Sequence, residues 1–99
     1  MRERRIVAAA SFGESLRDFP PDQQDRIKEA LGKFRDRTAE HALRNERKEG
    51  IGCWAFRVTG VSGVRVFHVP RSDDRGRYWL LFHVGQHNDY RTVRRKIPK

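Results

Sequence analysis

The sequence predicts an α+β domain with the element order β-α-α-β-β-β, in which two N-terminal helices pack on one face of a twisted antiparallel sheet. The first observation behind this prediction is the spacing of apolar residues. It follows a helical period in the N-terminal half and a period of two from Ile51 onward. The second is the length, because 99 residues hold one domain with one modest core. A three-stranded sheet needs another layer to bury its apolar face, and the helices supply it. We therefore treat residues 1–99 as a single domain.

The N-terminal region is expected to form a strand followed by a short helix. Residues 11–14 have Ser first and Glu fourth, which is the pattern of a capping box and places the helix start at Ser11. We assign the preceding residues 4–9 to an edge strand. Two consecutive prolines at positions 20 and 21 end the helix. One face of this helix carries three apolar side chains at positions i, i+4 and i+7, namely Phe12, Leu16 and Phe19.

A second helix is expected to begin at Pro21, because proline suits the first turn of a helix, and to fade between Thr38 and Leu43. Acidic residues lie near its N-terminus and basic residues near its C-terminus, which complements the helix dipole. Its apolar residues recur at i, i+3, i+4 and i+7, namely Ile27, Ala30, Leu31 and Phe34. The two helices therefore share one apolar side.

The C-terminal half is expected to form an antiparallel meander after a charged loop over residues 44–50. Its apolar residues alternate with period two in three strands, which cover residues 51–58, 64–69 and 78–84. Glycines in the turn over residues 59–63 supply positive φ angles, and a polar loop over residues 70–77 joins the next pair of strands.

The last strand is apolar on both faces, so we expect it to be the central strand, covered from both sides. A basic tail over residues 92–99 follows, and Pro98 argues against a long helix there. The face of the sheet opposite the two helices is expected to remain open as a concave, basic groove.

The charge of the chain is strongly positive, with 22 basic and 13 acidic residues and a formal net charge of +9. A field of this sign favours a polyanionic partner, RNA first and DNA or an acidic protein next. The alternative is a solvated basic surface without a dedicated partner. Cys53 is the single cysteine, so it cannot form an internal disulfide, and we expect a buried, inert thiol. We find no secretory signal and no apolar run long enough to span a membrane, which makes the cytoplasm the expected location.

Arg57 and Arg65 are expected on neighbouring strands, within reach of each other across the turn. Two adjacent guanidinium groups repel each other unless an anion lies between them. Because arginine binds phosphate oxygens in a bidentate manner, the pair is a candidate phosphate clamp. The alternative is that each arginine pairs with a local acid such as Glu46 or Glu49, or points into solvent.

The segment 84–91 holds two candidate proton-transfer groups, His87 and Tyr90. With arginines to hold the developing charge, such groups can cleave RNA without a metal ion, one removing the proton of the 2′-hydroxyl and another protonating the departing 5′-oxygen. The alternative is structural, with the histidine as a hydrogen-bonding partner and the tyrosine completing the core. Asp89 is expected to orient the turn.

The remaining histidines and the acidic pair are given no catalytic role. His41, His68 and His83 do not occur at metal-ligand spacing with other ligand residues, so we expect no metal site and no cofactor. Asp73 and Asp74 lie in a polar segment where aspartate is common for local hydrogen bonding.

Several short motifs, taken in their order and spacing, resemble the RelE/ParE superfamily of bacterial toxins from type II toxin–antitoxin modules. They follow the early strand and occupy residues 16–20, 24–31, 56–58, 63–66 and 84–91. The resemblance covers most of the chain. It implies a twisted antiparallel sheet preceded by two helices, and a cognate antitoxin as partner. An acidic, partly disordered antitoxin segment would suit the basic groove.

The resemblance also implies an activity. RNase members of the superfamily enter the ribosomal A site and cut mRNA without a metal ion, whereas ParE-like members instead inhibit DNA gyrase. Arg65 matches the arginine that steadies the scissile phosphate, and Arg57 matches a basic residue of the preceding strand. His87 falls where these members have an arginine or histidine, and Tyr90 resembles their C-terminal tyrosine.

The expected activity is therefore a ribosome-associated mRNA endonuclease that inhibits translation, with gyrase inhibition as the alternative. The residues expected to bind RNA are Lys48, Arg91, Arg94 and Arg95. RNase members of the RelE type carry a second basic residue on the strand of Arg57, and Ala55 occupies that position here.

Overall fold

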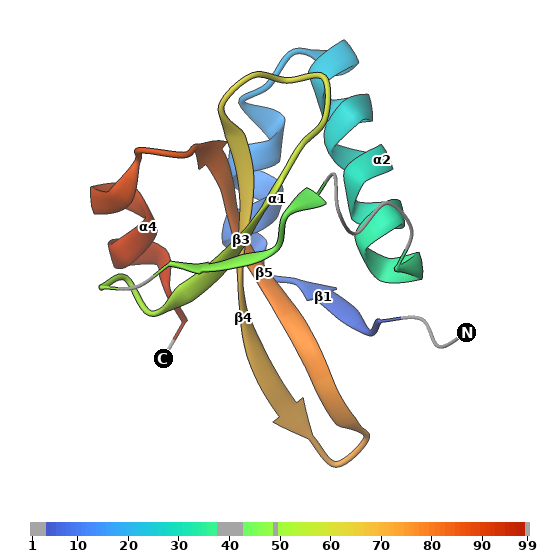
Figure 1. Ribbon diagram of the computed structural model, residues 1–99. Helices are drawn as coiled ribbons and strands as arrows, with labels where there is room; N and C mark the ends of the chain where they lie inside the picture. The colour runs from blue at the N-terminus through green and yellow to red at the C-terminus, as the bar shows by residue number, and fades with distance from the viewer. Residues whose placement is uncertain (1–3, 38–42, 49, 99) are drawn as a thin grey trace.

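The computed structural model describes residues 4–37, 43–48 and 50–98 and shows a five-stranded sheet with helices against both faces (Figure 1). The α+β class is confirmed, as is the helix pair that precedes the antiparallel strands. None of the described helices is long and apolar enough to cross a membrane. The elements in chain order are β1 (Ile6–Ala8), α1 (Ala10–Arg17), α2 (Pro21–Asp36), β2 (Glu46–Lys48), β3 (Cys53–Arg57), β4 (Val64–Asp73), β5 (Gly76–Gln86) and α4 (Tyr90–Lys96).

The strands lie in the spatial order β1-β5-β4-β3-β2. The pairs from β5 to β2 are antiparallel, as predicted, but β1 runs parallel to β5. The prediction of a wholly antiparallel sheet is therefore wrong at this edge. The chain leaves β1 through α1, which packs against β5, and this crossover lets β1 lie beside β5 in the same direction. β5 is interior, but the middle strand of the five is β4.

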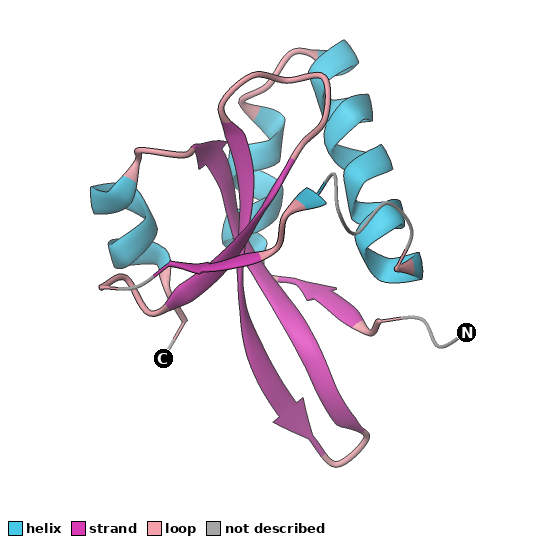
Figure 2. Ribbon diagram, viewed as in Figure 1, coloured by secondary structure: helices cyan, strands magenta, loops and turns pink. Residues whose placement is uncertain are grey.

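Three segments predicted as loop or tail are regular structure (Figure 2). The charged loop contains β2, an edge strand paired with β3. The polar loop over residues 70–77 is instead the end of a long β4–β5 hairpin that projects from the body of the protein (Figure 1). The basic tail contains α4. Polar strands carry no apolar alternation, so their pairing depends on backbone hydrogen bonds that the residue pattern does not reveal.

The hairpin is held to the N-terminus by Arg5, whose guanidinium donates to Asp73 Oδ1 at 2.9 Å. The same group lies over the Tyr78 ring, 4.8 Å from its centroid. The Arg5 guanidinium holds the pKa of Asp73 at about 2, well below its usual range. Asp73 therefore has Arg5 as a structural partner. As predicted, it also forms a local hydrogen bond, which it accepts from the Arg75 amide at 2.8 Å.

The predicted capping box is wrong, because α1 begins at Ala10 and Ala9 is its N-terminal cap. Ser11 instead donates its hydroxyl proton to the Phe82 carbonyl at 2.7 Å, which ties α1 to β5. α2 begins at Pro21 as predicted and ends at Asp36, where Arg37 takes a left-handed conformation with φ of 59°. Residues 38–42, over which we expected that helix to fade, lie outside the described residues, and His41 is among them.

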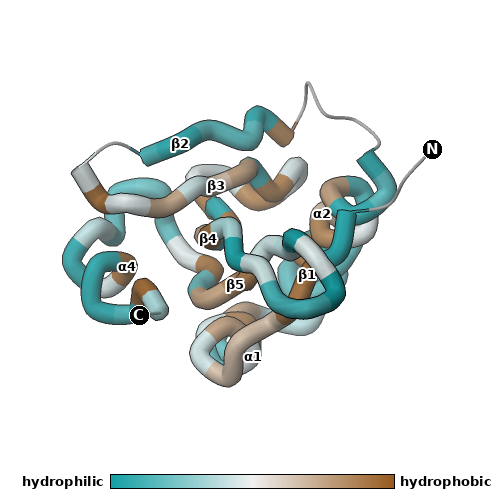
Figure 3. Tube along the Cα trace, turned by 90° about the horizontal axis from the view of Figure 1, so that it is seen from below, coloured by the Kyte–Doolittle hydropathy of each residue, from teal (hydrophilic) through white to brown (hydrophobic). Residues whose placement is uncertain are grey.

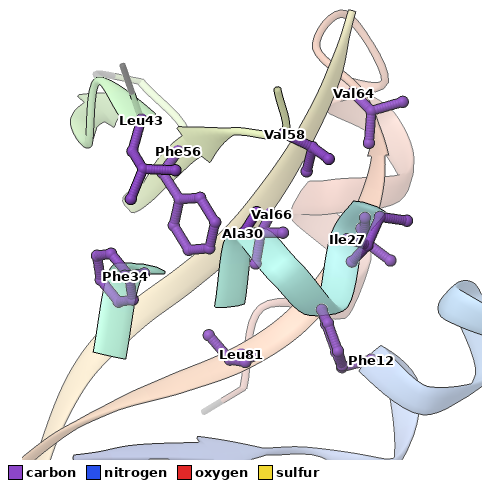
Figure 4. Packing of buried hydrophobic residues seen from close by; sticks show 11 residues of the cluster. Phe12, Ile27, Ala30, Phe34, Leu43, Phe56, Val58, Val64, Val66 and Leu81 are labelled. Atoms are coloured by element: carbon purple, nitrogen blue, oxygen red, sulfur yellow. The ribbon is translucent and has the colours of Figure 1, made fainter. Parts of the chain in front are cut away.

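Two hydrophobic layers sandwich the sheet, and Figure 3 shows α2 and α4 on opposite sides of the strands. The larger layer lies under α1 and α2, where Ile27 and Phe34 pack against Phe56 and Val66 (Figure 4). The smaller layer lies under α4, and its buried members are Cys53, Ala55, Phe67, Val69, Phe82 and Val93. The face that we predicted to be open is thus partly covered by α4. Arg57, which ends β3 near the β3–β4 turn, remains exposed on this face.

The larger layer contains one buried histidine, His68, which is fully buried among Phe34, Phe56 and Trp79. Its Nδ1 lies 3.0 Å from the Val66 carbonyl and its Nε2 lies 2.8 Å from Asn45 Oδ1. Burial lowers the pKa of this imidazole from 6.5 to about 3. The hydrogen bond to Val66 opposes that shift, and the Arg4 charge adds to it.

We expect the free energy of unfolding to decrease as the pH falls below 6.5, because the unfolded chain then binds a proton that the folded protein excludes. The loss from His68 alone is about 2 kcal/mol between roughly pH 7.5 and pH 5. Urea unfolding at the two pH values measures it. His68→Phe should show a pH dependence smaller by about that amount, and an unchanged dependence in this variant would contradict the assignment.

Candidate functional site

Arg57 and Arg65 lie directly opposite each other on β3 and β4, as the sequence predicts. Arg57 is exposed and Arg65 is half-buried. Among the described residues neither guanidinium forms an ion pair, and the contact of Arg65 Nη1 with the Val64 carbonyl is long, at 3.5 Å. The two positive groups therefore share one face of the sheet, and none of the described acidic residues pairs with them.

Electrostatics at Arg65 reflects this arrangement. Burial lowers the pKa of its guanidinium, and the neighbouring Arg57 charge lowers it further. Glu46 and Tyr90 act in the opposite direction and raise it. Glu46 is engaged with Lys48, 3.8 Å away, so it influences Arg65 from a distance rather than as a direct partner. The other acid considered from the sequence, Glu49, lies outside the described residues.

The arginine pair lines a depression of about 1020 Å³ at the β3–β4 turn. Its polar lining comes mainly from cationic or ionisable side chains, those of Arg44, Arg57, Arg65 and His87. The rest of the lining is the turn itself, residues 58–63. A concave surface with three guanidinium groups matches an anion such as a phosphodiester.

His87 reaches this depression because its backbone is tied to the turn. Its amide donates to the Gly63 carbonyl at 2.8 Å. Gly63 has a φ of +74°, and a Cβ at this position would lie 2.8 Å from Gln86 Oε1 and 3.5 Å from His87 Cδ2. Glycine therefore suits this position, because it adopts the positive φ angle without strain and lets Gln86 and His87 at the end of β5 approach the turn closely.

Tyr90 lies apart from the other three predicted catalytic residues. It begins α4, is 43% exposed, and lines a second depression of about 380 Å³ with Arg47, Lys48, Ile51 and Arg94. Tyr90 acts on Arg65 electrostatically and raises the pKa of that guanidinium. Lys48 and Arg94, predicted to bind RNA, line the second depression as well. Arg91 and Arg95 are exposed on α4 and line neither depression.

Arg44 and Arg47 are site residues that the sequence pattern did not reveal. Arg44 precedes β2 and Arg47 lies within it, in the segment that we interpreted as a charged loop, and each lines one of the two depressions. Their sequence signal was the run of basic residues beside the first C-terminal strand. That run is equally typical of a solvated loop.

The cysteine and the possible metal ligands do not form a further reactive site among the described residues. Cys53 is buried, as predicted, and burial raises the pKa of its thiol to about 11, which keeps it protonated and unreactive. Within the described residues, no group of three or more His, Cys, Asp or Glu side chains is arranged to hold a metal ion. The ionisable side chains that line the two depressions are those of arginine, lysine, histidine and tyrosine.

The order of the strands, the two leading helices and the C-terminal helix define a RelE-type fold. Two solved structures with this fold are toxin–antitoxin complexes. One chain of the RelBE2 complex from Mycobacterium tuberculosis is 20% identical to this protein with a TM-score of 0.51, and the match covers 85% of this chain and 98% of that one. One chain of the archaeal RelE–RelB complex from Pyrococcus horikoshii OT3 is 12% identical with a TM-score of 0.61, covering 88% and 98%.

These likenesses confirm the fold that the resemblance implied. At such low identities they concern the fold alone. No protein-family model matches the sequence, and no curated protein matches it.

We expect Gly63→Ala to lower the free energy of unfolding by about 1–3 kcal/mol, because a non-glycine residue is strained at this φ. Gly32→Ala is the matched control. Gly32 lies inside α2 with open space where a methyl group would lie, so this change should stabilise the helix by about 0.5–1 kcal/mol. Thermal unfolding of both variants tests whether their free energies of unfolding change in opposite directions. An unchanged free energy of unfolding in Gly63→Ala would refute the strain at the turn.

Proposed function

We propose that this protein is the toxin of a toxin–antitoxin pair and acts in the cytoplasm as a metal-independent, ribosome-associated mRNA endonuclease. The observation that carries the proposal is the Arg57–Arg65 pair, two adjacent guanidinium groups without a carboxylate partner among the described residues. The RelE-type fold supports it, because two solved structures with that fold are toxin–antitoxin complexes.

The proposed reaction is an internal transesterification of RNA. The 2′-oxygen of one nucleotide attacks the adjacent phosphorus, the bond from phosphorus to the 5′-oxygen breaks, and a 2′,3′-cyclic phosphate and a 5′-hydroxyl result. One proton leaves the 2′-hydroxyl and one is delivered to the 5′-oxygen. Arg57 and Arg65 bind the phosphate oxygens and stabilise the negative charge that grows on them.

His87 and Tyr90 are the groups proposed to move these protons. His87 lines the depression that contains the arginine pair, and Tyr90 lines the second depression. Two separate ionisable groups suit a reaction in which one group removes a proton and the other supplies one. Lys48 and Arg94 in the second depression, with Arg91 and Arg95 on α4, provide positive charge for the flanking RNA.

The antitoxin partner is proposed to be an acidic segment that covers the two depressions. Several arginines and Lys48 surround them. An acidic chain that folds on binding complements this surface and excludes RNA from it. The RelBE2 structure is a toxin–antitoxin complex and the archaeal structure is a RelE–RelB complex, which supports a protein partner.

We expect Arg65→Ala and Arg57→Ala each to reduce mRNA cleavage at least about a hundredfold, because each removes a donor to the charged transition state. Growth after induction and primer extension on cellular mRNA measure the effect. Arg77→Ala is the matched control, since Arg77 is exposed on the distant β4–β5 hairpin and its loss removes the same charge.

Discrete cleavage sites in mRNA that disappear in both variants and persist in Arg77→Ala support the proposal. Growth arrest with a DNA-damage response, stabilised gyrase cleavage complexes and intact mRNA would overturn it and indicate the ParE-like activity. Full toxicity of both variants would overturn the role of the pair.

Tyr90→Phe removes the hydroxyl while it preserves the exposed ring at the start of α4. We expect cleavage to decrease about tenfold to a thousandfold, since general acid–base catalysis contributes roughly 10²–10⁴-fold and a water molecule replaces part of it. RNA binding should be nearly unchanged. Single-turnover cleavage on programmed ribosomes separates the two effects, and a normal rate in this variant would exclude the hydroxyl from proton transfer.

A further inference from the structure

His83 is a buried histidine that the proposed reaction does not use. It lies on β5 with 5% of its surface exposed. The β4–β5 register shifts beside it, because Phe67 pairs with His83 whereas the next residue of β4 pairs with Leu81. The bulge leaves out Phe82, whereas His83 keeps the regular alternation of β5 and pairs with Phe67, whose side chain lies in the layer under α4. The His83 ring lies on the same face, 5.8 Å from that of Phe67.

The imidazole contacts both ends of α4. Its Nδ1 lies 3.4 Å from Lys96 Nζ, and Lys96 is the last residue of the helix. Its Nε2 lies 3.6 Å from Asp89 Oδ2, and Asp89 is the N-terminal cap of the same helix. An ammonium group only donates, so Nδ1 accepts and the proton of the neutral ring is on Nε2, directed toward the Asp89 carboxylate.

The ring is tightly seated. A Cβ on Gly85 would lie 2.7 Å from His83 Nε2, so the absence of a side chain at Gly85 makes room for the imidazole. Gly85 is also the residue of β5 that pairs with Arg65. Among the described residues Nε2 has no hydrogen-bond partner within normal distance. The Asp89 carboxylate, 3.6 Å away, is the acidic group paired with it electrostatically.

We propose that His83 is a positioning residue that fixes α4 against the sheet through Lys96 and Asp89 and thereby holds Tyr90 in place at the start of that helix. Tyr90 directly follows Asp89, so a displacement of the helix start displaces Tyr90 with it. The effect on catalysis rests on the function proposed above, whereas the anchoring of α4 does not. Burial lowers the pKa of His83, Lys96 lowers it further and Asp89 opposes both, so the ring stays neutral near pH 7 and accepts from Lys96.

The test compares three variants of the full chain. His83→Phe keeps an aromatic ring but removes both nitrogen atoms. His83→Gln restores an acceptor and a donor in one planar group, and Lys96→Met removes the ammonium without touching β5. Amide hydrogen exchange at Val93 and Ile97, whose N–H groups close the turns of α4, reports the anchoring. Single-turnover RNA cleavage on programmed ribosomes reports its effect on Tyr90.

We expect exchange at both amides to be about tenfold faster in His83→Phe and Lys96→Met, with β5 amides unchanged, because about one buried polar interaction is lost. Cleavage should fall about tenfold in parallel. In His83→Gln, the amide exchange rates and the cleavage rate should both stay close to those of the wild type. In a Tyr90→Phe background, His83→Phe should have no further effect on cleavage, since its influence acts through Tyr90.

Unchanged exchange in both His83→Phe and Lys96→Met would overturn the anchoring. Faster exchange with a normal cleavage rate, or an additional loss in the Tyr90→Phe background, would overturn the link to Tyr90. If the wild-type protein cuts no RNA but α4 exchanges faster in the variants, the anchoring stands and the proposed function fails.

Discussion

The register of the β3–β4 hairpin is the constraint on which the site depends. It places Arg57 directly opposite Arg65 on one face of the sheet, while Phe56 and Val66 pair on the other face and are buried under the helices. A slip by one residue would expose that apolar pair and bury the arginines, so the core and the site specify the same register. The repulsion between the two guanidinium groups is offset by the packing beneath them.

The remaining parts of the site are attached to this hairpin by a few short-range contacts. The bond from the His87 amide to the Gly63 carbonyl joins the end of β5 to the turn. α4 then packs on the sheet, where Val93 is fully buried, and carries Tyr90 at its first position. The site is thus built from one rigid hairpin and one small helix. Its two halves can differ in stability, because a helix of seven residues depends on its tertiary contacts.

Much of the fold and of the arginine pair could be predicted from the sequence because both depend on local patterns. Helical spacing identified the buried stripe of α2, and alternation with a glycine turn brought Arg57 and Arg65 together. The parallel placement of β1 could not be predicted, since the direction of an edge strand is set by how the helices cross the sheet. α4 was missed because it has few apolar residues within a basic segment; Val93 is the buried one, and Ile97 follows as the C-terminal cap.

The division of the site into two depressions could not be predicted from the sequence. His87 and Tyr90 are three positions apart, yet α4 begins at Tyr90 and the two side chains line different depressions. The role of His83 was hidden for a related reason. Its partners Lys96 and Asp89 are the last residue and the N-terminal cap of α4, a helix that the sequence pattern did not reveal.

The central claim is that the juxtaposed arginines bind a phosphodiester, and binding of a short, uncleavable 2′-O-methyl RNA tests it most directly. Fluorescence anisotropy would compare the wild type with two double variants that lose equal charge. Arg57→Ala/Arg65→Ala removes the pair, and Arg17→Ala/Arg77→Ala removes two exposed arginines elsewhere. We predict that the first weakens binding about a hundredfold, as expected for lost charge-assisted hydrogen bonds, and that the second has a small effect. Equal weakening by both would show that only net charge attracts RNA and would contradict the account.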